Sequence, residues 1–525
     1  MKVGIISVFV DYHRRGRKYR LTTQPGIGPL LAGLLPRNVE VDVVHETWRD
    51  PDWSRDYDLL FISSHHSDFD RARQIAHFWR RRGAKTVYGG ALASTYPDLC
   101  QPFFDAIVVG DPEASVPQAF ADFARGALKP RYAAYRYDAS LVRTPRFELI
   151  DGQSYMPLWL EATRGCPFEC EFCVLTGLGT RHQVRPVDDV VRDITRGQDA
   201  IRRRWMPYRH RVIGFADNNI GGRPSYLREL CEKLVPLKLQ WGAAATFNVA
   251  AKPDLVRLMS RAGCRVLFVG LESFNPEAIR DMNKNQNVVT KIRAVIDNCR
   301  RNGILLVSGL MISPLTDDLD YLAAIPGHLE ASGLQLPTFI SFETPIPGTP
   351  HFHRLAGQRA PALLPNALLR DFTGYTLTVR PQRVPLAEFV DAYRTLIERV
   401  YSWRRRLRKL ASDLPCFLPR GYWFPALIDT VDALAVDPQP HPARSLIAGS
   451  DTPPPESVPL CASDFDSEDE FHNIMDPWRV TDQNGAVREQ WHTARPVFRA
   501  AARMFEARRP TGLLQEKPDA ENVSF

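Results

Sequence analysis

Short apolar runs alternate with amphipathic stretches over the first 135 residues of the chain. The runs are Val3–Val10, Val39–Val44, Leu59–Ser63, "KTVYGG" at 85–90 and Ala106–Val109. Continuous apolar runs of this length are typical of strands buried on both faces of a sheet. Between the third and fourth runs, apolar residues follow helical spacing from Phe69 to Trp79. Strands that alternate with helices predict a parallel, doubly wound sheet over 1–135, with its ligand crevice at the carboxyl ends of the strands.

A second alternating series begins near residue 150. Its expected strands are Leu158–Thr163, Val212–Ala216, Leu239–Phe247, Arg265–Gly270, Ile304–Leu310 and Thr338–Glu343. Helical patterns separate them, among them Pro253–Ala262 and Val288–Arg301. Six βα units over 150–350 are too few for a closed eight-stranded barrel. The pattern therefore predicts an open, partial (β/α)6 barrel of the TIM type.

The alternation fades after residue 351. Ala387–Trp403 is apolar at helical spacing, and it predicts a mostly helical region over 351–435. Residues 436–460 are rich in proline and 463–470 are acidic. Within 436–525, we expect this proline-rich and acidic segment to be a surface linker or lid with little packed structure, and the remainder to be a terminal helical tail. The fold class is thus α/β, with two parallel-sheet domains and a helical C-terminal region.

Composition limits the class of protein. No run of eighteen apolar residues occurs, so no transmembrane helix is expected. The cysteines number nine, are mostly isolated and suggest a reducing cytoplasm. The net charge of +7 comes largely from arginine triplets at 80–82, 202–204 and 404–406. They lie at the ends of amphipathic stretches, so we interpret them as solvated helix faces rather than a nucleic-acid site.

Three of the nine cysteines lie within eight residues, in "RGCPFECEFC". Cys166, Cys170 and Cys173 have the spacing C-x₃-C-x₂-C, which arises by chance in about one such chain in several hundred. Closely spaced thiolates in a cytosolic protein usually bind metal. Structural zinc normally requires four protein ligands, for which His182 is the available fourth. Three thiolates on a 4Fe–4S cluster leave one iron open for a small molecule. Both interpretations remain at this point.

The cysteine spacing and its flanks resemble the radical S-adenosylmethionine (radical SAM) superfamily. "TRGCPFECEFC" follows "PLWLEA" as the superfamily's loop follows its first barrel strand, and the aromatic Phe172 precedes the last cysteine. "GFADNNIGG" resembles the second-strand motif, which contains Asp217 and Asn219. "FVGLESFNPEAIRDMNK" resembles the fourth-strand segment and offers Glu272. "VSGLMIS", with Gly309, and "TPIPGTP" resemble the ends of strands five and six.

This resemblance implies a catalytic iron–sulfur site. The three cysteines would ligate three irons of a 4Fe–4S cluster, and S-adenosylmethionine would chelate the fourth. Phe172, Asp217, Glu272 and Gly309 would line the cosubstrate site. An electron from an external donor such as flavodoxin or ferredoxin would then yield a 5′-deoxyadenosyl radical, with the protein supplying orientation and a dry cavity.

The N-terminal part resembles the cobalamin-binding, Rossmann-like domain of one radical SAM class. The matching segments are "QPGIGPLLAGLLP", "VYGGALASTYPD" and "AIVVGDPEASVPQAF". The resemblance implies a corrin held against the sheet edge near Gly89 and Gly90. In "DYHRRG", His13 stands where related domains place a cobalt ligand, and the alternative is a basic loop. His65 and His66 are weaker candidates. A domain that has kept the fold and lost the cofactor is the other interpretation.

The function that follows is methylation of an unactivated carbon in a small-molecule, lipid or tetrapyrrole-like metabolite. The alternative is a radical cyclisation, rearrangement or oxidation without methyl transfer. Methylthiolation of tRNA is disfavoured because residues 1–150 contain only Cys100, which cannot hold a second cluster. A non-catalytic cobalamin or metal sensor is a further possibility, against which the intact triplet and Glu272 argue. No nucleic-acid partner is expected.

Overall fold

The computed structural model describes residues 1–10, 26–154, 156–201, 209–356, 362–434, 446–449 and 457–480. The N-terminal part is one parallel sheet in the order β2-β1-β3-β4-β5-β6. Its strands are β1 (Lys2–Ser7), β2 (Glu40–His45), β3 (Leu59–Ser63), β4 (Lys85–Gly89), β5 (Ala106–Gly110) and β6 (Arg131–Ala134). The chain adds β2 on one side of β1 and then β3 to β6 on the other side. Doubly wound sheets bind ligands at such a switch point, which here lies between β1 and β3.

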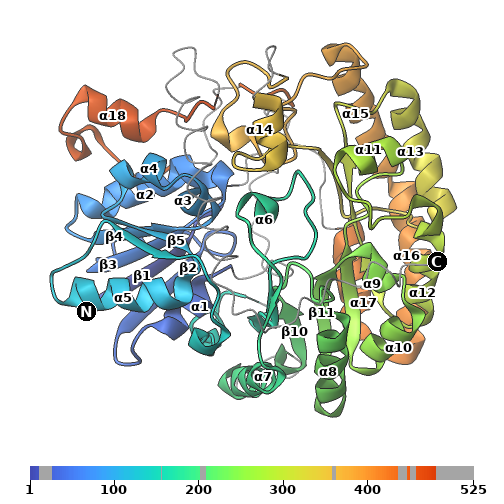
Figure 1. Ribbon diagram of the computed structural model, residues 1–525, viewed down its shortest axis with the longest axis horizontal. Helices are drawn as coiled ribbons and strands as arrows, with labels where there is room; N and C mark the ends of the chain where they lie inside the picture. The colour runs from blue at the N-terminus through green and yellow to red at the C-terminus, as the bar shows by residue number, and fades with distance from the viewer. Residues whose placement is uncertain are drawn as a thin grey trace, which may run out of the picture.

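Helices cover both faces of this sheet (Figure 1). They are α1 (Gly28–Leu34), α2 (Phe69–Arg80), α3 (Ala91–Thr95), α4 (Pro97–Cys100) and α5 (Pro112–Ala124). Successive strand residues point to opposite faces. Val3 and Ile5 therefore pack with α1 and α5, whereas Ile6 packs with α2 and α3. Two apolar cores result, as the continuous apolar runs predicted.

The second series forms six strand positions of an open barrel. Five strands pair in parallel in the order β13-β12-β11-β10-β7. Their bounds are β7 (Trp159–Leu160), β10 (Val212–Phe215), β11 (Gln240–Ala245), β12 (Cys264–Val269) and β13 (Leu305–Val307). A parallel pair, β14 (Gly309–Ile312) and β15 (Phe339–Phe342), continues the curve through a bridge between Glu272 and Leu310.

The helices of this part alternate with its strands, as the sequence predicted. They are α7 (Val187–Ile201), α8 (Pro224–Leu234), α9 (Phe247–Ala250), α10 (Pro253–Arg261), α11 (Pro276–Asp281), α12 (Ile292–Arg301), α13 (Leu319–Ser332) and α14 (Pro350–Ala356). A short antiparallel pair, β8 (Thr163–Arg164) with β9 (Gln183–Val184), and α6 (Val174–Gly177) flank the cysteine loop.

The fifth barrel strand is interrupted, which the sequence did not indicate. Ser308 separates β13 from β14 and is fully buried. Its hydroxyl accepts the Leu271 N–H at 3.3 Å, and its carbonyl accepts the Thr338 N–H at 2.8 Å. Because Ser308 makes these bonds, it belongs to neither β13 nor β14.

The C-terminal region contains α15 (Leu386–Val400), α16 (Trp403–Phe417), α17 (Trp423–Leu434) and α18 (Glu468–Met475). The predicted helix over Ala387–Trp403 ends at Val400, because Ser402 adopts an extended backbone and a new helix starts. The expectation of solvated arginines holds for 80–82 but is wrong for Arg405 and Arg406, which are buried. The triplet at 202–204 lies outside the described residues. No helix among the described residues is long and apolar enough to cross a membrane.

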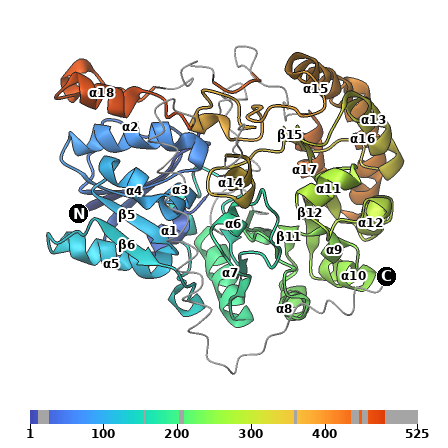
Figure 2. The same cartoon turned by 45° about the horizontal axis from the view of Figure 1, so that its top comes forward.

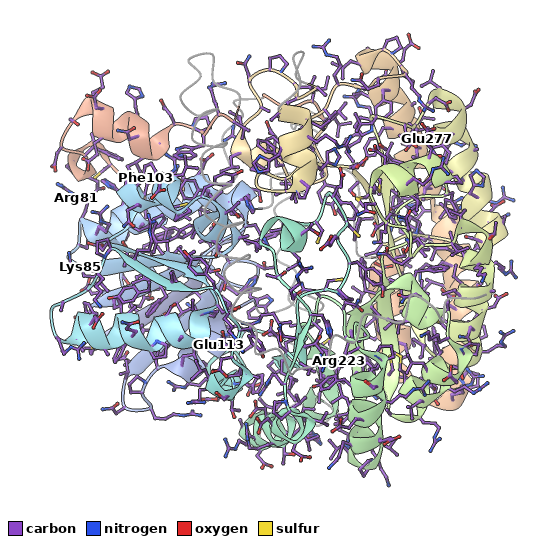
Figure 3. All side chains as sticks on the ribbon, viewed as in Figure 1. Arg81, Lys85, Phe103, Glu113, Arg223 and Glu277 are labelled. Atoms are coloured by element: carbon purple, nitrogen blue, oxygen red, sulfur yellow. The ribbon has the colours of Figure 1, made fainter. Side chains whose placement is uncertain are left out.

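Residues 457–480 pack on α2 (Figures 1 and 2), so the expectation of little packed structure is wrong for this segment. Arg73 is fully buried, and its guanidinium donates to Asp70 and to the Asp476 carbonyl, each at 2.7 Å. The Phe465 ring stacks on His77 at 4.9 Å. At the rim, Arg81 pairs with Asp466 at 2.8 Å (Figure 3 labels Arg81 beneath α18). Local composition gave no sign of these long-range contacts.

Candidate active site

The three cysteines lie on the loop between β8 and α6, at the carboxyl end of the first barrel strand. Gly165 opens the loop with φ +84°, and a Cβ there would collide with the Arg181 carbonyl. Two bonds of 3.1 Å brace the loop at Glu171. Its N–H donates to the Met282 carbonyl, and its own carbonyl accepts the His351 N–H. The loop is therefore held from both sides by distant parts of the barrel.

Two side-chain amides donate toward the cysteine sulfurs. Asn219 Nδ2 lies 3.7 Å from Cys166 Sγ, and Gln286 Nε2 lies 3.6 Å from Cys170 Sγ. Burial raises the pKa of the Cys170 thiol, while the Lys284 ammonium and Gln286 act in the opposite direction. Burial likewise raises the pKa of Cys173, against backbone hydrogen bonds from Leu175 and Thr176. A cation and N–H donors around thiols stabilise the thiolates that a metal cluster requires.

The donor set fits a cluster better than a zinc ion. Within the described ranges, no group of three or more His, Cys, Asp or Glu side chains is arranged to hold a single metal ion. His182, the sequence's candidate for a fourth zinc ligand, instead contacts the Asn219 carbonyl through Nε2 at 3.1 Å. A four-iron cluster binds each thiolate to a different iron, so its ligands lie farther apart than those of one ion at about 2.3 Å from each sulfur.

Glu272 forms a buried ion pair with Lys284 beside the cysteine loop. Glu272 has φ +64°, a left-handed conformation that is rare outside glycine, and its carbonyl accepts the Met311 N–H at 2.6 Å. Burial alone lowers the pKa of Lys284, but Glu272, Cys170 and Cys173 together raise it, so the ammonium stays charged. A Cβ at Gly270 would collide with the Glu272 carboxylate. This glycine therefore leaves the room that the ion pair occupies.

Phe172 and Gly309 also lie in this part of the barrel. Lys284 Nζ is 5.6 Å from the centre of the Phe172 ring. A Cβ at Gly309 would collide with the Phe339 ring. Gly309 thus keeps β14 and β15 close together.

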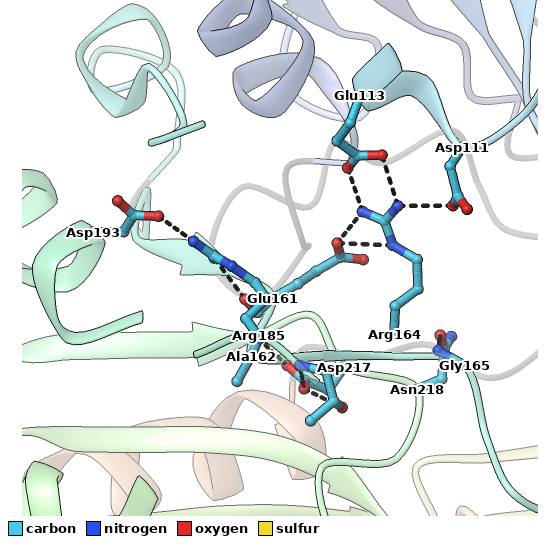
Figure 4. Close-up of polar contacts among 11 residues, drawn as sticks. Asp111, Glu113, Glu161, Ala162, Arg164, Gly165, Arg185, Asp193, Asp217 and Asn218 are labelled. Carbon is cyan, nitrogen blue, oxygen red and sulfur yellow. Dashed lines mark hydrogen bonds and ion pairs between the residues drawn. The ribbon is translucent and has the colours of Figure 1, made fainter. Parts of the chain in front are cut away.

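Asp217 holds the main chain that leads into the cysteine loop. Its carboxylate accepts the Ala162 N–H at 3.1 Å and both the N–H and hydroxyl of Thr163. Burial raises the pKa of Asp217 to about 7, against these hydrogen bonds. All of these contacts are with Ala162 and Thr163, which lead into the cysteine loop, so Asp217 positions the loop. Figure 4 shows the carboxylate beneath Ala162.

Arg164 connects the cysteine loop to the N-terminal sheet, a role that sequence reasoning missed. Its guanidinium reaches Asp111 at 2.8 Å and Glu113 at 2.7 Å, just beyond β5, and also pairs with Glu161 (Figure 4). Figure 3 places Glu113 at the boundary of the two parts. The Tyr137 ring centre lies 4.5 Å from the guanidinium carbon. Both segments had been singled out as motifs, but only the fold brings their opposite charges together.

Small residues bring the sheet, the cysteine loop and the loop after β15 into contact. A Cβ at Gly177 of α6 would collide with the Gly348 carbonyl, and a Cβ at Gly348 would collide with Thr95 of α3. Gly348 has φ +93° and belongs to "TPIPGTP". Three segments far apart in the sequence therefore meet beside α6.

The predicted cobalamin-binding residues Gly89 and Gly90 lie at the carboxyl edge of the N-terminal sheet. Gly90 has φ +127°, and a Cβ there would lie 2.9 Å from the Ser64 carbonyl, whereas Gly89 meets only ordinary contacts. His66 is buried, and burial lowers its pKa to about 3, so the ring is neutral. Burial also lowers the pKa of His65. His13 lies outside the described residues.

Comparison with known proteins identifies the barrel. Residues 160–323 match the family model of the Radical SAM superfamily. The chain is 28% identical over 307 residues to bacteriochlorophyllide d C-12(1)-methyltransferase of Chlorobaculum tepidum, covering 57% of this chain and 66% of that protein. It is 27% identical over 342 residues to hopanoid C-2 methylase of Rhodopseudomonas palustris, covering 62% and 63%. The chain thus spans slightly less than two thirds of each relative.

A solved structure shares the fold. It is the radical S-adenosylmethionine methyltransferase TsrM of Kitasatospora setae with cobalamin and a [4Fe–4S] cluster bound. The TM-score is 0.52 at 17% identity, and the match covers 74% of this chain and 83% of that one. The likeness supports the α/β architecture described above.

Proposed function

Residues 160–323 are a radical SAM domain, and on that premise we propose that the protein is a cobalamin-dependent radical SAM C-methyltransferase. The observation that carries the proposal is the joining of two sites. A three-cysteine loop with amide and ammonium neighbours is tied through Arg164 to the carboxyl edge of a doubly wound sheet. Doubly wound sheets bind cofactors at that edge.

The chain's own residues have distinct tasks in this reaction. Cys166, Cys170 and Cys173 hold three irons of a 4Fe–4S cluster and leave the fourth iron to S-adenosylmethionine. Glu272 now pairs with the Lys284 ammonium. The amino group of the cosubstrate is also an ammonium, so Glu272 can exchange one cation for the other and free Lys284 for the cosubstrate carboxylate. Phe172 and Gly309 shape the surrounding wall.

When bound, the cluster and cosubstrate supply a 5′-deoxyadenosyl radical, and cobalamin supplies the methyl group. The protein fixes the position of the radical source relative to the methyl source, because Arg164 holds the cysteine loop against Asp111 and Glu113. At the sheet edge, Gly89 and Gly90 present backbone without side chains to the corrin, and His13 is the candidate cobalt ligand. The protein also requires an external reductant of the flavodoxin or ferredoxin type.

The substrate class follows from the relatives. One is named for a bacteriochlorophyllide and the other for a hopanoid. Both names denote largely apolar, multi-ring molecules with unactivated carbon atoms. We therefore assign to this chain a lipophilic, ring-containing metabolite as substrate, methylated at carbon.

The test is anaerobic reconstitution of the full chain with iron, sulfide and hydroxocobalamin. Iron, sulfide and co-eluting cobalamin are measured per chain, then 5′-deoxyadenosine released with S-adenosylmethionine and reductant. We expect all four, and we expect the Cys166→Ala/Cys170→Ala/Cys173→Ala variant to lose cluster and deoxyadenosine. Cys461→Ala, at an exposed cysteine on the docked C-terminal segment, is the matched control and should retain both. A cluster with deoxyadenosine but no cobalamin would leave radical chemistry and reject methyl transfer. A fully loaded cluster that never cleaves the cosubstrate would reject both.

A further inference from the structure

The helix α16 buries most of its charged side chains and exposes the two large apolar side chains of its first turns. Its sequence, "WRRRLRKLASDLPCF", has five basic residues and one acidic residue. Trp403 is 67% exposed and Leu407, one turn later, is 59% exposed. Arg405, Arg406, Lys409 and Asp413 are buried. A surface helix of a globular protein normally shows the reverse arrangement.

The buried charges fix this orientation. Lys409 forms an ion pair with Asp429 of α17, and its ammonium also lies 3.3 Å from Asp413. Arg405 donates to the Pro326 carbonyl at 2.6 Å, and Arg406 donates to the Tyr401 carbonyl at 2.9 Å. A rotation that buried Trp403 would leave these charges without their partners, which is strongly unfavourable in a protein interior. Trp403 and Leu407 therefore face outward, whereas Phe417 at the end of α16 is buried.

The exposed apolar side chains continue onto α17. Eleven large apolar side chains are exposed in the described part of the chain, and six of them fall within residues 403–434. We call the face formed by Trp403, Leu407, Leu418, Leu427 and Leu434 the α16–α17 surface. Concentrations of this kind mark interaction sites, whereas scattered apolar residues do not. In Figures 1 and 2 both helices lie on the outer side of the barrel, away from α6.

Basic side chains accompany the α16–α17 surface. Arg404 and Arg420 are exposed, whereas Arg408 is exposed but pairs with Glu330 at 3.1 Å. Arginine can lay its aliphatic stem along an apolar surface while its guanidinium reaches an anionic group beyond. Tryptophan favours the boundary between water and hydrocarbon. An apolar face with a tryptophan and a basic rim is the arrangement that lies in the headgroup region of a membrane.

We propose that the α16–α17 surface docks the protein on an anionic lipid bilayer. Trp403 and the leucines enter the boundary between headgroups and acyl chains, and Arg404 and Arg420 contact lipid phosphates. The proposal concerns the surface alone and does not depend on the reaction proposed above. It would place the enzyme where lipophilic metabolites partition.

Two other occupants fit less well. In a symmetric dimer through this surface, the same patch would face itself, so two basic α16 helices would be opposed and repel. A protein electron donor must approach the cysteine loop, which lies elsewhere on the barrel. An anionic bilayer complements both the apolar centre and the basic rim.

The experiment is co-sedimentation of the full chain with two kinds of vesicle. One contains phosphatidylcholine mixed with phosphatidylglycerol, and the other contains phosphatidylcholine alone. We expect binding to the mixed vesicles and at least about ten-fold weaker binding to the neutral ones, given Arg404 and Arg420 near the surface. The variant Arg404→Gln/Arg420→Gln should reduce this preference for anionic lipid.

The decisive variant is Trp403→Ser/Leu407→Ser, which should bind the mixed vesicles at least about ten-fold more weakly. Its matched control is Leu319→Ser/Phe471→Ser, at apolar side chains exposed elsewhere, 38% and 41%. Circular dichroism and thermal melting should be unchanged in both variants, because all four side chains are exposed. Absence of binding to the mixed vesicles, or undiminished binding by the decisive variant, would overturn the proposal. A dimer that dissociates in that variant would assign the surface to a second copy and also overturn it.

Discussion

The two parallel sheets end in edges that use polar side chains differently. At the barrel edge, Asn219 and Gln286 aim N–H groups at cysteine sulfurs, and Lys284 adds a charge. At the edge of the N-terminal sheet, carboxylates hold main chain, as Asp217 also does at the barrel edge. Glu46 accepts the Phe9 N–H and Asp68 accepts the Val10 N–H, each at 3.1 Å, where the chain leaves β1. One edge is built to direct side-chain atoms at a cluster, and the other to fix the backbone around a ligand.

This difference has a consequence for substitution. At the barrel edge, a change that deletes one donor alters the environment of one sulfur. At the sheet edge, a change in size or charge alters the shape of the backbone. The bridge through Arg164 belongs to both edges, so its loss should have the largest effect of the changes considered below.

Arg164→Met should lower the free energy of unfolding by about 3 kcal/mol, because it leaves Asp111, Glu113 and Glu161 without their shared cation. The measurement is urea unfolding of the purified chain. Arg394→Met is the control, since its ion pair with Asp391 is exposed on both sides and should contribute less than about 1 kcal/mol. Equal losses in the two variants would contradict a buried bridge.

Asn219→Leu removes an N–H donor to Cys166 at a fully buried position. A thiolate without that donor holds electron density less well, so we expect a more negative cluster midpoint potential and about ten-fold lower activity. The potential is measured by a redox titration followed by electron paramagnetic resonance. Gln286→Leu should shift it less, because Gln286 is half-buried and water can replace its amide. A larger shift for Gln286→Leu would reverse the assigned importance of the two amides.

Gly90→Ala should destabilise the protein by about 2 kcal/mol and weaken cobalamin retention. The new Cβ would meet the Ser64 carbonyl in a backbone conformation that already disfavours alanine. Gly83→Ala is the matched control, with φ +91° and no neighbouring atom within 4 Å, and should cost about 1 kcal/mol. Thermal melting and cobalamin co-elution are the two readouts. If both variants kept cobalamin equally, Gly90 would not line its site.

Asp68→Asn should have the smallest effect at low pH and a growing one as pH rises. Burial raises the pKa of Asp68 to about 8 from a model-compound value of 3.8. A raised folded-state pKa contributes stability that is complete below about pH 4 and is lost as pH rises through about 8. Asparagine does not ionise, so the variant lacks this loss of stability. Its free energy of unfolding should therefore increasingly exceed that of the parent as pH rises over that range. Denaturant unfolding at several pH values measures it.

Asp217→Asn sharpens the same comparison at the barrel edge. The pKa of Asp217 is raised to about 7. The pH range over which Asp217 loses its contribution to stability should therefore end about one pH unit below the corresponding range of Asp68. Identical pH ranges for the two variants would contradict the difference in burial and partners assigned to these carboxyl groups.

Much of the architecture followed from apolar runs and their spacing. Leu59–Ser63 is a strand with the predicted bounds, because five consecutive apolar or small residues fit only a strand covered on both faces. The cysteine loop was placed correctly after the first barrel strand, because its spacing allows few other interpretations. In contrast, β6 (Arg131–Ala134) carries charge and no apolar run, and only its pairing with β5 makes it a strand.

The sequence alone thus determined most of the order of strands and helices, the three-cysteine motif and the parallel class of both sheets. These features depend on local periodicity and residue type. Tertiary structure decided which charges meet, because that depends on residues distant in the sequence. It joined Arg164 to Glu113, set Lys284 beside both Glu272 and the thiols, and docked 457–480 on α2. It also left Trp403 and Leu407 of α16 exposed, since Lys409 pairs with Asp429 of α17 and Arg405 donates to the Pro326 carbonyl of α13, contacts that the sequence of α16 alone cannot supply.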